Sequence, residues 1–233
     1  MKNNRIFLRA SLFLLLVSLL LCACQGTKAA DPPHTDFFEN VSFLGDSITA
    51  HMESRAGISP SRLWVTRERY LNLDSRITYA RILAPDTGEE ETIACVAARL
   101  KPPFLVITLG VDYGVYYYRN DLSLFEKYYE KLLDAITEAS PETTLLLQSV
   151  FPVTAASKSI TNEMIDNANA SIRAIAERRA LHYLDTQSVL RDENGYLRAE
   201  FCSSADGIHL SEQGYRAVLS YIGNFAAERG WRA

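Results

Sequence analysis

The chain has 233 residues, of which 48% are hydrophobic and 22% are charged, and its formal charge is −4. This composition is typical of a globular protein and excludes a disordered chain, a collagen and a coiled coil. The length fits one α/β domain or two small ones, and a single domain is favoured. The acidic balance argues against a nucleic-acid partner, because no excess of basic residues is available to neutralise phosphates.

Residues 1–23 have the pattern of a signal peptide. Three basic residues occur within the first nine, and the uncharged run over residues 10–23 is too short to span a bilayer as a stable helix. The run ends in Leu-Cys-Ala-Cys-Gln, which resembles the bacterial lipoprotein box. Cys24 follows a small residue and fits the lipidated position, whereas Cys22 follows a leucine and fits badly. The alternative is an ordinary secretory signal that is cleaved nearby.

Cleavage before Cys24 would remove three basic residues and no acidic one, leaving 21 basic and 28 acidic residues and a formal charge of −7. The surface of such a chain is not attracted to an anionic membrane, so the lipid must supply the attachment. We therefore expect an extracytoplasmic protein anchored in the cell membrane. Residues 24–36 are expected to form a tether, and residues 37–233 a single folded domain.

Two further cysteines, Cys95 and Cys202, lie far apart in the sequence. An exported compartment permits a disulfide, but one distant pair is weak evidence for it, and we expect free or buried thiols. These cysteines and the four histidines show no metal-ligand spacing, so no metal is expected.

Short apolar runs alternate with longer helical patterns over the rest of the chain. The predicted strands cover residues 41–44, 76–83, 104–109, 143–150 and 181–184, and the predicted helices cover 89–100, 122–136, 164–178 and 218–225. Residues 51–75 are ambiguous. The alternation predicts a mostly parallel sheet with helices on both faces. In such sheets the functional site lies at the carboxyl ends of the strands.

Ser47 follows the first predicted strand directly, within Gly-Asp-Ser. A serine at a strand-to-helix turn can expose its hydroxyl, and its backbone N–H can point at an oxyanion. The alternative is a helix-capping serine without chemistry. The nucleophile elbow Gly-x-Ser-x-Gly is not present, because Thr49 takes the second glycine position. His51, one helical turn further on, can approach the same place, although an ordinary helix histidine is the simpler interpretation.

Asp206 and His209 lie three residues apart in a segment rich in small residues. At this spacing the carboxylate can reach one ring nitrogen while the other nitrogen faces a nucleophile. The carboxylate would then fix the imidazole tautomer and stabilise the imidazolium. The alternative is a local Asp–His pair without catalytic meaning.

Taken together, Phe-Leu-Gly-Asp-Ser-Ile-Thr at residues 43–49 and Asp-Gly-Ile-His-Leu-Ser-Glu-Gln-Gly-Tyr at residues 206–215 resemble the first and last blocks of the SGNH, or GDSL, hydrolase family. The resemblance runs from about residue 41 to 226. It implies a three-layer α/β/α, flavodoxin-like fold with a five-stranded sheet, and ester hydrolysis without a cofactor. It also implies roles for three residues: Ser47 as nucleophile and oxyanion donor, His209 as general base and then acid, and Asp206 as the group that orients the histidine.

Two positions depart from the family pattern. The family has an oxyanion-donating glycine after its second strand, and Gly88 is the candidate here, although Pro-Asp-Thr-Gly also fits a plain turn. The family block Gly-x-Asn is replaced by Gly110-Val111-Asp112. An ionised Asp112 has no donor for the oxyanion and would repel it. The residue is therefore held protonated, or activity is weak, or the chain has left hydrolysis for binding. A plain capping role is the alternative.

The resemblance and the expected location predict a lipid-anchored serine esterase. Its substrates would be small acyl esters, acetyl esters above all, on a carbohydrate, a cell-wall polymer or a small molecule. Two alternatives stay open. A lysophospholipase or thioesterase would need a long apolar cleft, and a catalytically inactive surface binding protein would follow from the loss of the oxyanion donor at Asp112.

Overall fold

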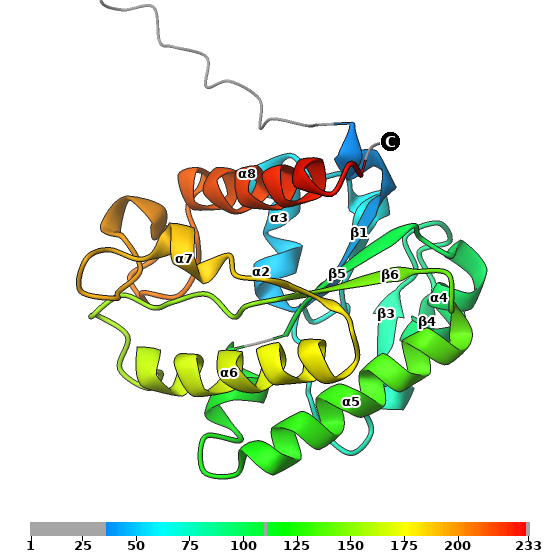
Figure 1. Ribbon diagram of the computed structural model, residues 1–233, viewed down its shortest axis with the longest axis horizontal. Helices are drawn as coiled ribbons and strands as arrows, with labels where there is room; N and C mark the ends of the chain where they lie inside the picture. The colour runs from blue at the N-terminus through cyan, green and yellow to red at the C-terminus, as the bar shows by residue number, and fades with distance from the viewer. Residues whose placement is uncertain (1–35, 110, 232–233) are drawn as a thin grey trace, which may run out of the picture. The chain divides into compact units, whose positions relative to one another are not determined.

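Five parallel strands form the central sheet in the computed structural model, which describes residues 36–109 and 111–231 (Figure 1). They are β1 (Val41–Gly45), β2 (Leu63–Trp64), β5 (Phe104–Thr108), β6 (Thr144–Gln148) and β7 (His182–Leu184). Their spatial order is β2-β1-β5-β6-β7, and each neighbouring pair is parallel. This is the flavodoxin order, in which the chain reverses direction across the sheet at its first strand. The predicted fold class is confirmed.

The strands are apolar because both faces of the sheet are covered. In β1, Leu44 belongs to one hydrophobic cluster and Phe43 to a second cluster on the opposite face. In β5, Ile107 and Val106 divide between the same two clusters, and all four side chains are at most 1% exposed. Burial on both faces is what makes a parallel strand a continuous apolar run.

Helices cover both faces of the sheet. The described α-helices are α2 (Ser47–Ala50), α3 (Met52–Ala56), α4 (Ile93–Leu100), α5 (Leu122–Ala139), α6 (Asn162–Arg178), α7 (Gln187–Leu190) and α8 (Glu212–Glu228). Helices α4, α5 and α6 pack on one face, and α3, α7 and α8 pack on the other, which makes three layers (Figure 1). Short 3-10 turns lie at Phe37–Asn40, Pro60–Arg62, Ile77–Tyr79 and Ala199–Phe201, and a π-helix at Val111–Tyr116.

The longer helices begin at side chains that cap them. Thr92, Asp121, Thr161 and Ser211 each accept a hydrogen bond from the backbone N–H three residues further on. Such caps satisfy N–H groups that the first helical turn leaves without an acceptor. The predicted helices 122–136, 164–178 and 218–225 are confirmed. α5 begins at Leu122 as predicted and ends later, at Ala139, whereas α6 and α8 begin earlier, at the residues after the Thr161 and Ser211 caps.

The predicted second strand, residues 76–83, is wrong as a member of the main sheet. Only β3 (Arg81–Leu83) is extended there, and it pairs antiparallel with β4 (Glu90–Thr92) in a separate two-stranded sheet. The main sheet takes its second strand from the ambiguous stretch before it, as the two-residue β2. Two residues are too short to show a periodic pattern, which is why the sequence did not reveal the strand.

The predicted helix 89–100 starts too early. Residues 90–92 form β4, and the helix begins at Ile93 after the Thr92 cap. The acidic side chains before the helix pair with arginines instead of facing the helix dipole. The Glu91 carboxylate lies 2.6 Å from Arg99 Nη2, and the Glu90 carboxylate lies 2.9 Å from Arg67 Nε.

The described residues all belong to one structural unit. Both Cys95 and Cys202 are free thiols in it, as expected. Within the described ranges, no helix is long and apolar enough to cross a membrane, and no group of three or more His, Cys, Asp or Glu side chains is placed to hold a metal. The signal peptide, Cys24 and the tether up to residue 35 lie outside the described residues.

Candidate active site

The turn from β1 into α2 holds Ser47 at the carboxyl edge of the sheet. Gly45 is required there, because a Cβ atom at this position would lie 2.2 Å from Thr49 Oγ1 and 2.4 Å from the Thr108 carbonyl oxygen. Asp46 is buried and caps the helix, since its carboxylate accepts the N–H of Ile48 at 3.0 Å. Ser47 is therefore the first helical residue, where the helix offers its own N–H no acceptor. The predicted strand-to-helix turn is present.

Three predicted residues meet at this turn. The Ser47 hydroxyl oxygen lies 3.2 Å from Nε2 of His209, although 162 residues separate them in the chain. On the other side of the ring, Nδ1 of His209 lies 2.9 Å from an Asp206 carboxylate oxygen. The His209 side chain is 24% exposed and the Asp206 side chain 44%. The structure thus brings Ser47, His209 and Asp206 into one hydrogen-bonded line that solvent can reach.

The segment that carries His209 is a narrow loop. Its base is closed where Cys202 and Leu210 form an antiparallel bridge, and the Ser203 N–H donates to the His209 carbonyl oxygen at 2.9 Å. Asp206 shapes the tip, because its second carboxylate oxygen accepts the Ile208 N–H at 2.8 Å and the Ser204 hydroxyl. The loop therefore turns back on itself and aims the imidazole at Ser47.

The Asp206 carboxylate is held ionised. Burial alone would raise the pKa of this carboxyl group, but hydrogen bonds from the Ser204 hydroxyl, the Ile208 N–H and the His209 ring outweigh burial and lower the pKa to about 2. A carboxylate that stays charged at neutral pH can fix the Nδ1–H tautomer of His209. That tautomer leaves Nε2 as the proton acceptor facing Ser47.

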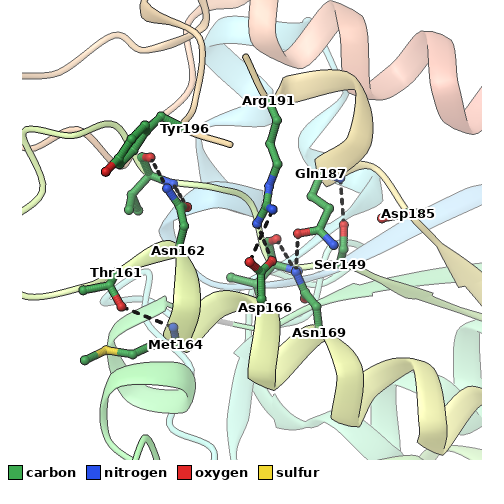
Figure 2. Close-up of polar contacts among 12 residues, drawn as sticks. Ser149, Thr161, Asn162, Met164, Asp166, Asn169, Asp185, Gln187, Arg191 and Tyr196 are labelled. Carbon is green, nitrogen blue, oxygen red and sulfur yellow. Dashed lines mark hydrogen bonds and ion pairs between the residues drawn. The ribbon is translucent and has the colours of Figure 1, made fainter. Parts of the chain in front are cut away.

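The chain that follows β6, residues 149–154, contacts the loop that carries His209 and is itself bonded to α6. Asn169 accepts the Val150 N–H at 2.7 Å, and Asn162 accepts the Val153 N–H at 2.9 Å, so α6 fixes the chain that follows β6 (Figure 2). Thr154, the next residue, donates its N–H to the Gly207 carbonyl oxygen at 2.9 Å. This contact connects the sheet's far half to the His209 loop, and nothing in the sequence pattern indicated it.

His51 also lies at the site. Its ring meets the His209 ring edge to face, with ring centres 4.9 Å apart. Burial, followed by the charges of Arg55, His209 and Arg69, lowers the pKa of His51 to about 4, against a small opposing effect of Asp206. The position one turn after Ser47 was the only sequence signal for this contact.

Gly88 does not fit the expected oxyanion donor. It lies in the turn between β3 and β4 with φ +73°, and its N–H already donates to the Ala84 carbonyl oxygen at 2.7 Å. The N–H is thus occupied in a tight turn, which is the plain-turn alternative for Pro-Asp-Thr-Gly. The expectation failed because the predicted second strand before Gly88 is a hairpin strand and does not belong to the main sheet.

The role of Asp112 at the oxyanion position remains a prediction. Its side chain and Gly110 lie outside the described residues, although the backbone at Asp112 is part of the π-helix Val111–Tyr116. The site of lipidation, Cys24, is likewise outside them.

Two hollows adjoin the segments that carry the three residues. Ala50, in the same short helix as Ser47, lines a hollow of about 320 Å³ together with Leu63, Val65, Arg69 and Leu83. Ser203, Ser204 and Ala205, just before Asp206, line a wider hollow of about 830 Å³ together with Tyr196 and Thr154.

A parallel sheet in the flavodoxin order, with Ser47 after its first strand and the Asp206–His209 pair before its last helix, defines the SGNH class of hydrolase folds. The chain belongs to the GDSL-like lipase/acylhydrolase family, whose family model matches residues 43–217. It is an SGNH/GDSL-type serine hydrolase that acts on ester bonds. No match is found among the curated proteins.

Solved structures agree on the fold. A Streptococcus pneumonia protein named for platelet activating factor is 19% identical with a TM-score of 0.59, and the match covers 93% of this chain and 98% of that one. A GDSL-like lipase from Bacteroides thetaiotaomicron is 17% identical, with a TM-score of 0.56 and coverage of 89% and 96%. A carbohydrate esterase family 3 protein from Talaromyces cellulolyticus is 16% identical, with a TM-score of 0.53 and coverage of 81% and 96%.

Proposed function

We propose that this protein is a lipid-anchored esterase that uses Ser47 as nucleophile, His209 as general base and acid, and Asp206 to orient His209. The observation that carries the proposal is the unbroken line of contacts from the Ser47 hydroxyl through both His209 nitrogens to Asp206, at 3.2 Å and 2.9 Å. A nucleophile, a base within hydrogen-bond reach and a third group that orients the base are the parts that acyl transfer requires.

The reaction runs in two halves. Ser47 Oγ attacks the ester carbonyl carbon while its proton passes to Nε2 of His209, and the carbonyl oxygen becomes an oxyanion near the Ser47 N–H. The intermediate then collapses: the C–O bond breaks, His209 returns the proton to the departing alkoxide, and an acyl-serine remains. Water, deprotonated by His209, then attacks this ester. The bond between the acyl carbon and Ser47 Oγ breaks, His209 returns the proton to Oγ, and the carboxylic acid and free Ser47 are released.

Small acyl groups, acetyl above all, are the proposed substrates, carried on a carbohydrate or cell-wall polymer. The hollow beside Ala50 is about 320 Å³, a volume at the lower end of ligand pockets. The wider, open hollow beside Ser204 leaves room for a larger alcohol portion. The Talaromyces relative in fold is itself named a carbohydrate esterase, which makes this substrate class the natural first trial.

The deciding experiment compares hydrolysis of p-nitrophenyl acetate by the wild-type protein and by Ser47→Ala across pH. Loss of turnover in the variant supports the proposal. Equal rates would overturn it and favour a binding protein on a hydrolase scaffold. A panel of acetylated glycans and of acyl esters of graded length then tests the substrate class, and a preference for long acyl chains would favour a lysophospholipase or thioesterase instead.

We also propose that Cys24 carries the lipid and becomes the first residue of the mature, extracytoplasmic chain. Cells fed labelled palmitate should incorporate label into the wild-type protein and into Cys22→Ala, but not into Cys24→Ala. Label in Cys24→Ala would overturn the assignment, because it would show that a different residue is modified.

A further inference from the structure

Ser47, His51 and Arg55 lie at intervals of four residues along α2 and α3. The helical register continues across the junction of the two helices, because the His51 N–H donates to the Ser47 carbonyl oxygen and the Arg55 N–H donates to the His51 carbonyl oxygen, each at 3.0 Å. Side chains four residues apart share one face of a helix. The three side chains therefore form a single stripe, which we call the Ser47–Arg55 stripe.

Every member of this stripe touches the loop that carries His209. Ser47 and His51 contact the His209 ring itself, the first by a 3.2 Å hydrogen bond and the second edge to face at 4.9 Å between ring centres. Arg55 Nη1 donates to the Leu210 carbonyl oxygen and to the Ser203 hydroxyl, both at 2.7 Å.

The Arg55 contacts hold both strands of the loop at once. Leu210 follows His209 directly, and Ser203 is bonded to the His209 carbonyl oxygen through its N–H at 2.9 Å and its hydroxyl at 3.1 Å. A guanidinium group presents several donors in a rigid plane, so one side chain can fix two acceptors in a set geometry. Movement of the His209 backbone away from α3 would break these bonds.

The His51 ring packs against the His209 ring and is uncharged at neutral pH. Its Nδ1 atom is buried without a hydrogen-bond partner among the described residues. The charged groups that face it are Arg55 on α3, Arg69 after β2, and His209 with Asp206 on the loop; their combined effect, with burial, lowers its pKa to about 4. A neutral neighbour does not oppose the positive charge that His209 gains when it takes the serine proton.

We propose that His51 and Arg55 are positioning residues that hold the His209 imidazole against Ser47. This inference rests on the proposed function, since it assigns the two residues to the same reaction. The contacts that the structure gives them are with the face or edge of the His209 ring, the Leu210 carbonyl oxygen and the Ser203 hydroxyl. His51 acts through ring packing, and Arg55 through the backbone on both sides of His209.

The first test replaces His51. In His51→Ala the ring contact is lost, and we expect kcat for p-nitrophenyl acetate to fall roughly ten- to hundredfold while KM changes little, because a misplaced base lowers the rate of the chemical step. His51→Phe keeps an aromatic ring at the same place and should retain kcat within about threefold of wild type. A Phe variant as slow as the Ala variant would overturn the ring-packing role.

The second test replaces Arg55. Arg55→Met keeps most of the apolar stem and removes the donors, and we expect the same fall in kcat at nearly constant KM. Arg178→Met is the matched control, because Arg178 ends α6 and bonds Glu126 and Glu130 on α5. It should leave kcat unchanged. Full activity of Arg55→Met would overturn the role of Arg55.

A third readout does not depend on turnover. The proton between Nδ1 of His209 and Asp206 should give a downfield NMR signal that His209→Ala abolishes. We expect this signal to shift or broaden in His51→Ala and Arg55→Met and to stay unchanged in Arg178→Met. An unchanged signal in both test variants would overturn the inference and leave the proposed function intact. Equal rates of wild type and Ser47→Ala would overturn the proposed function and, with it, the catalytic meaning of these contacts.

Discussion

The Asp206 carboxylate bonds the His209 ring directly, and it also bonds the backbone of the loop that holds His209. One carboxylate oxygen lies 2.9 Å from the ring Nδ1, and the other accepts the Ile208 N–H at 2.8 Å. Gly207 between them has φ +76°, and a Cβ there would lie 2.2 Å from Thr154 Oγ1. The same carboxylate therefore builds the turn and orients the imidazole.

Asp206→Asn should lower kcat by about 10²- to 10⁴-fold with p-nitrophenyl acetate. The amide can keep the hydrogen bond but favours the wrong histidine tautomer and cannot stabilise the imidazolium. Steady-state kinetics at neutral pH measure the effect. A variant with kcat near the wild-type value would mean that Asp206 only shapes the loop.

Lowering the pH from about 6.5 to about 4 should destabilise the wild-type protein more than His51→Phe. The pKa of His51 falls from 6.5 to about 4 on folding, so the unfolded chain binds the proton first and the free energy of unfolding decreases over this interval. Urea unfolding at several pH values measures the difference. His182, whose pKa burial and Arg229 also lower, is present in both proteins and cancels in the comparison. Identical pH slopes would contradict the prediction.

Gly45→Ala should lower the free energy of unfolding by about 1–3 kcal/mol or more, because overpacking at a rigid backbone contact forces the strands apart. The added Cβ would stand 2.4 Å from the Thr108 carbonyl oxygen of the neighbouring strand. Gly114→Ala is the control, since its Cβ would meet only Phe125 at an ordinary 3.5 Å. Urea denaturation that finds both variants equally stable would refute this account of Gly45.

Asp112→Asn should raise esterase activity at neutral pH. An asparagine amide can donate to the oxyanion and an ionised aspartate cannot, and one such donor is typically worth about 2.7–4 kcal/mol of barrier. Measurement of kcat/KM for both proteins tests this. A large drop in the variant would refute it. Wild-type activity that falls as the pH rises would instead indicate a protonated Asp112.

The sequence determined the fold class and the three residues of the site. The continuous apolar run at residues 104–109 predicts a strand that is covered on both faces, and the run itself shows this without reference to the rest of the chain. The motifs at residues 43–49 and 206–215 predicted the site residues, because the two motifs together are typical of one hydrolase family.

Tertiary structure decided what depends on packing between distant segments. β3 pairs with β4 and not with a strand of the main sheet. The residues of β3 alone do not show which strand they will pair with. This pairing also places Gly88 in the turn between β3 and β4, where its N–H donates to the Ala84 carbonyl oxygen and is not available to an oxyanion. The contacts of His51 and Arg55 with the His209 loop arise only when α3 and the chain before α8 meet. Sequence periodicity describes one element at a time, whereas these contacts are relations between elements brought together by burial of the core.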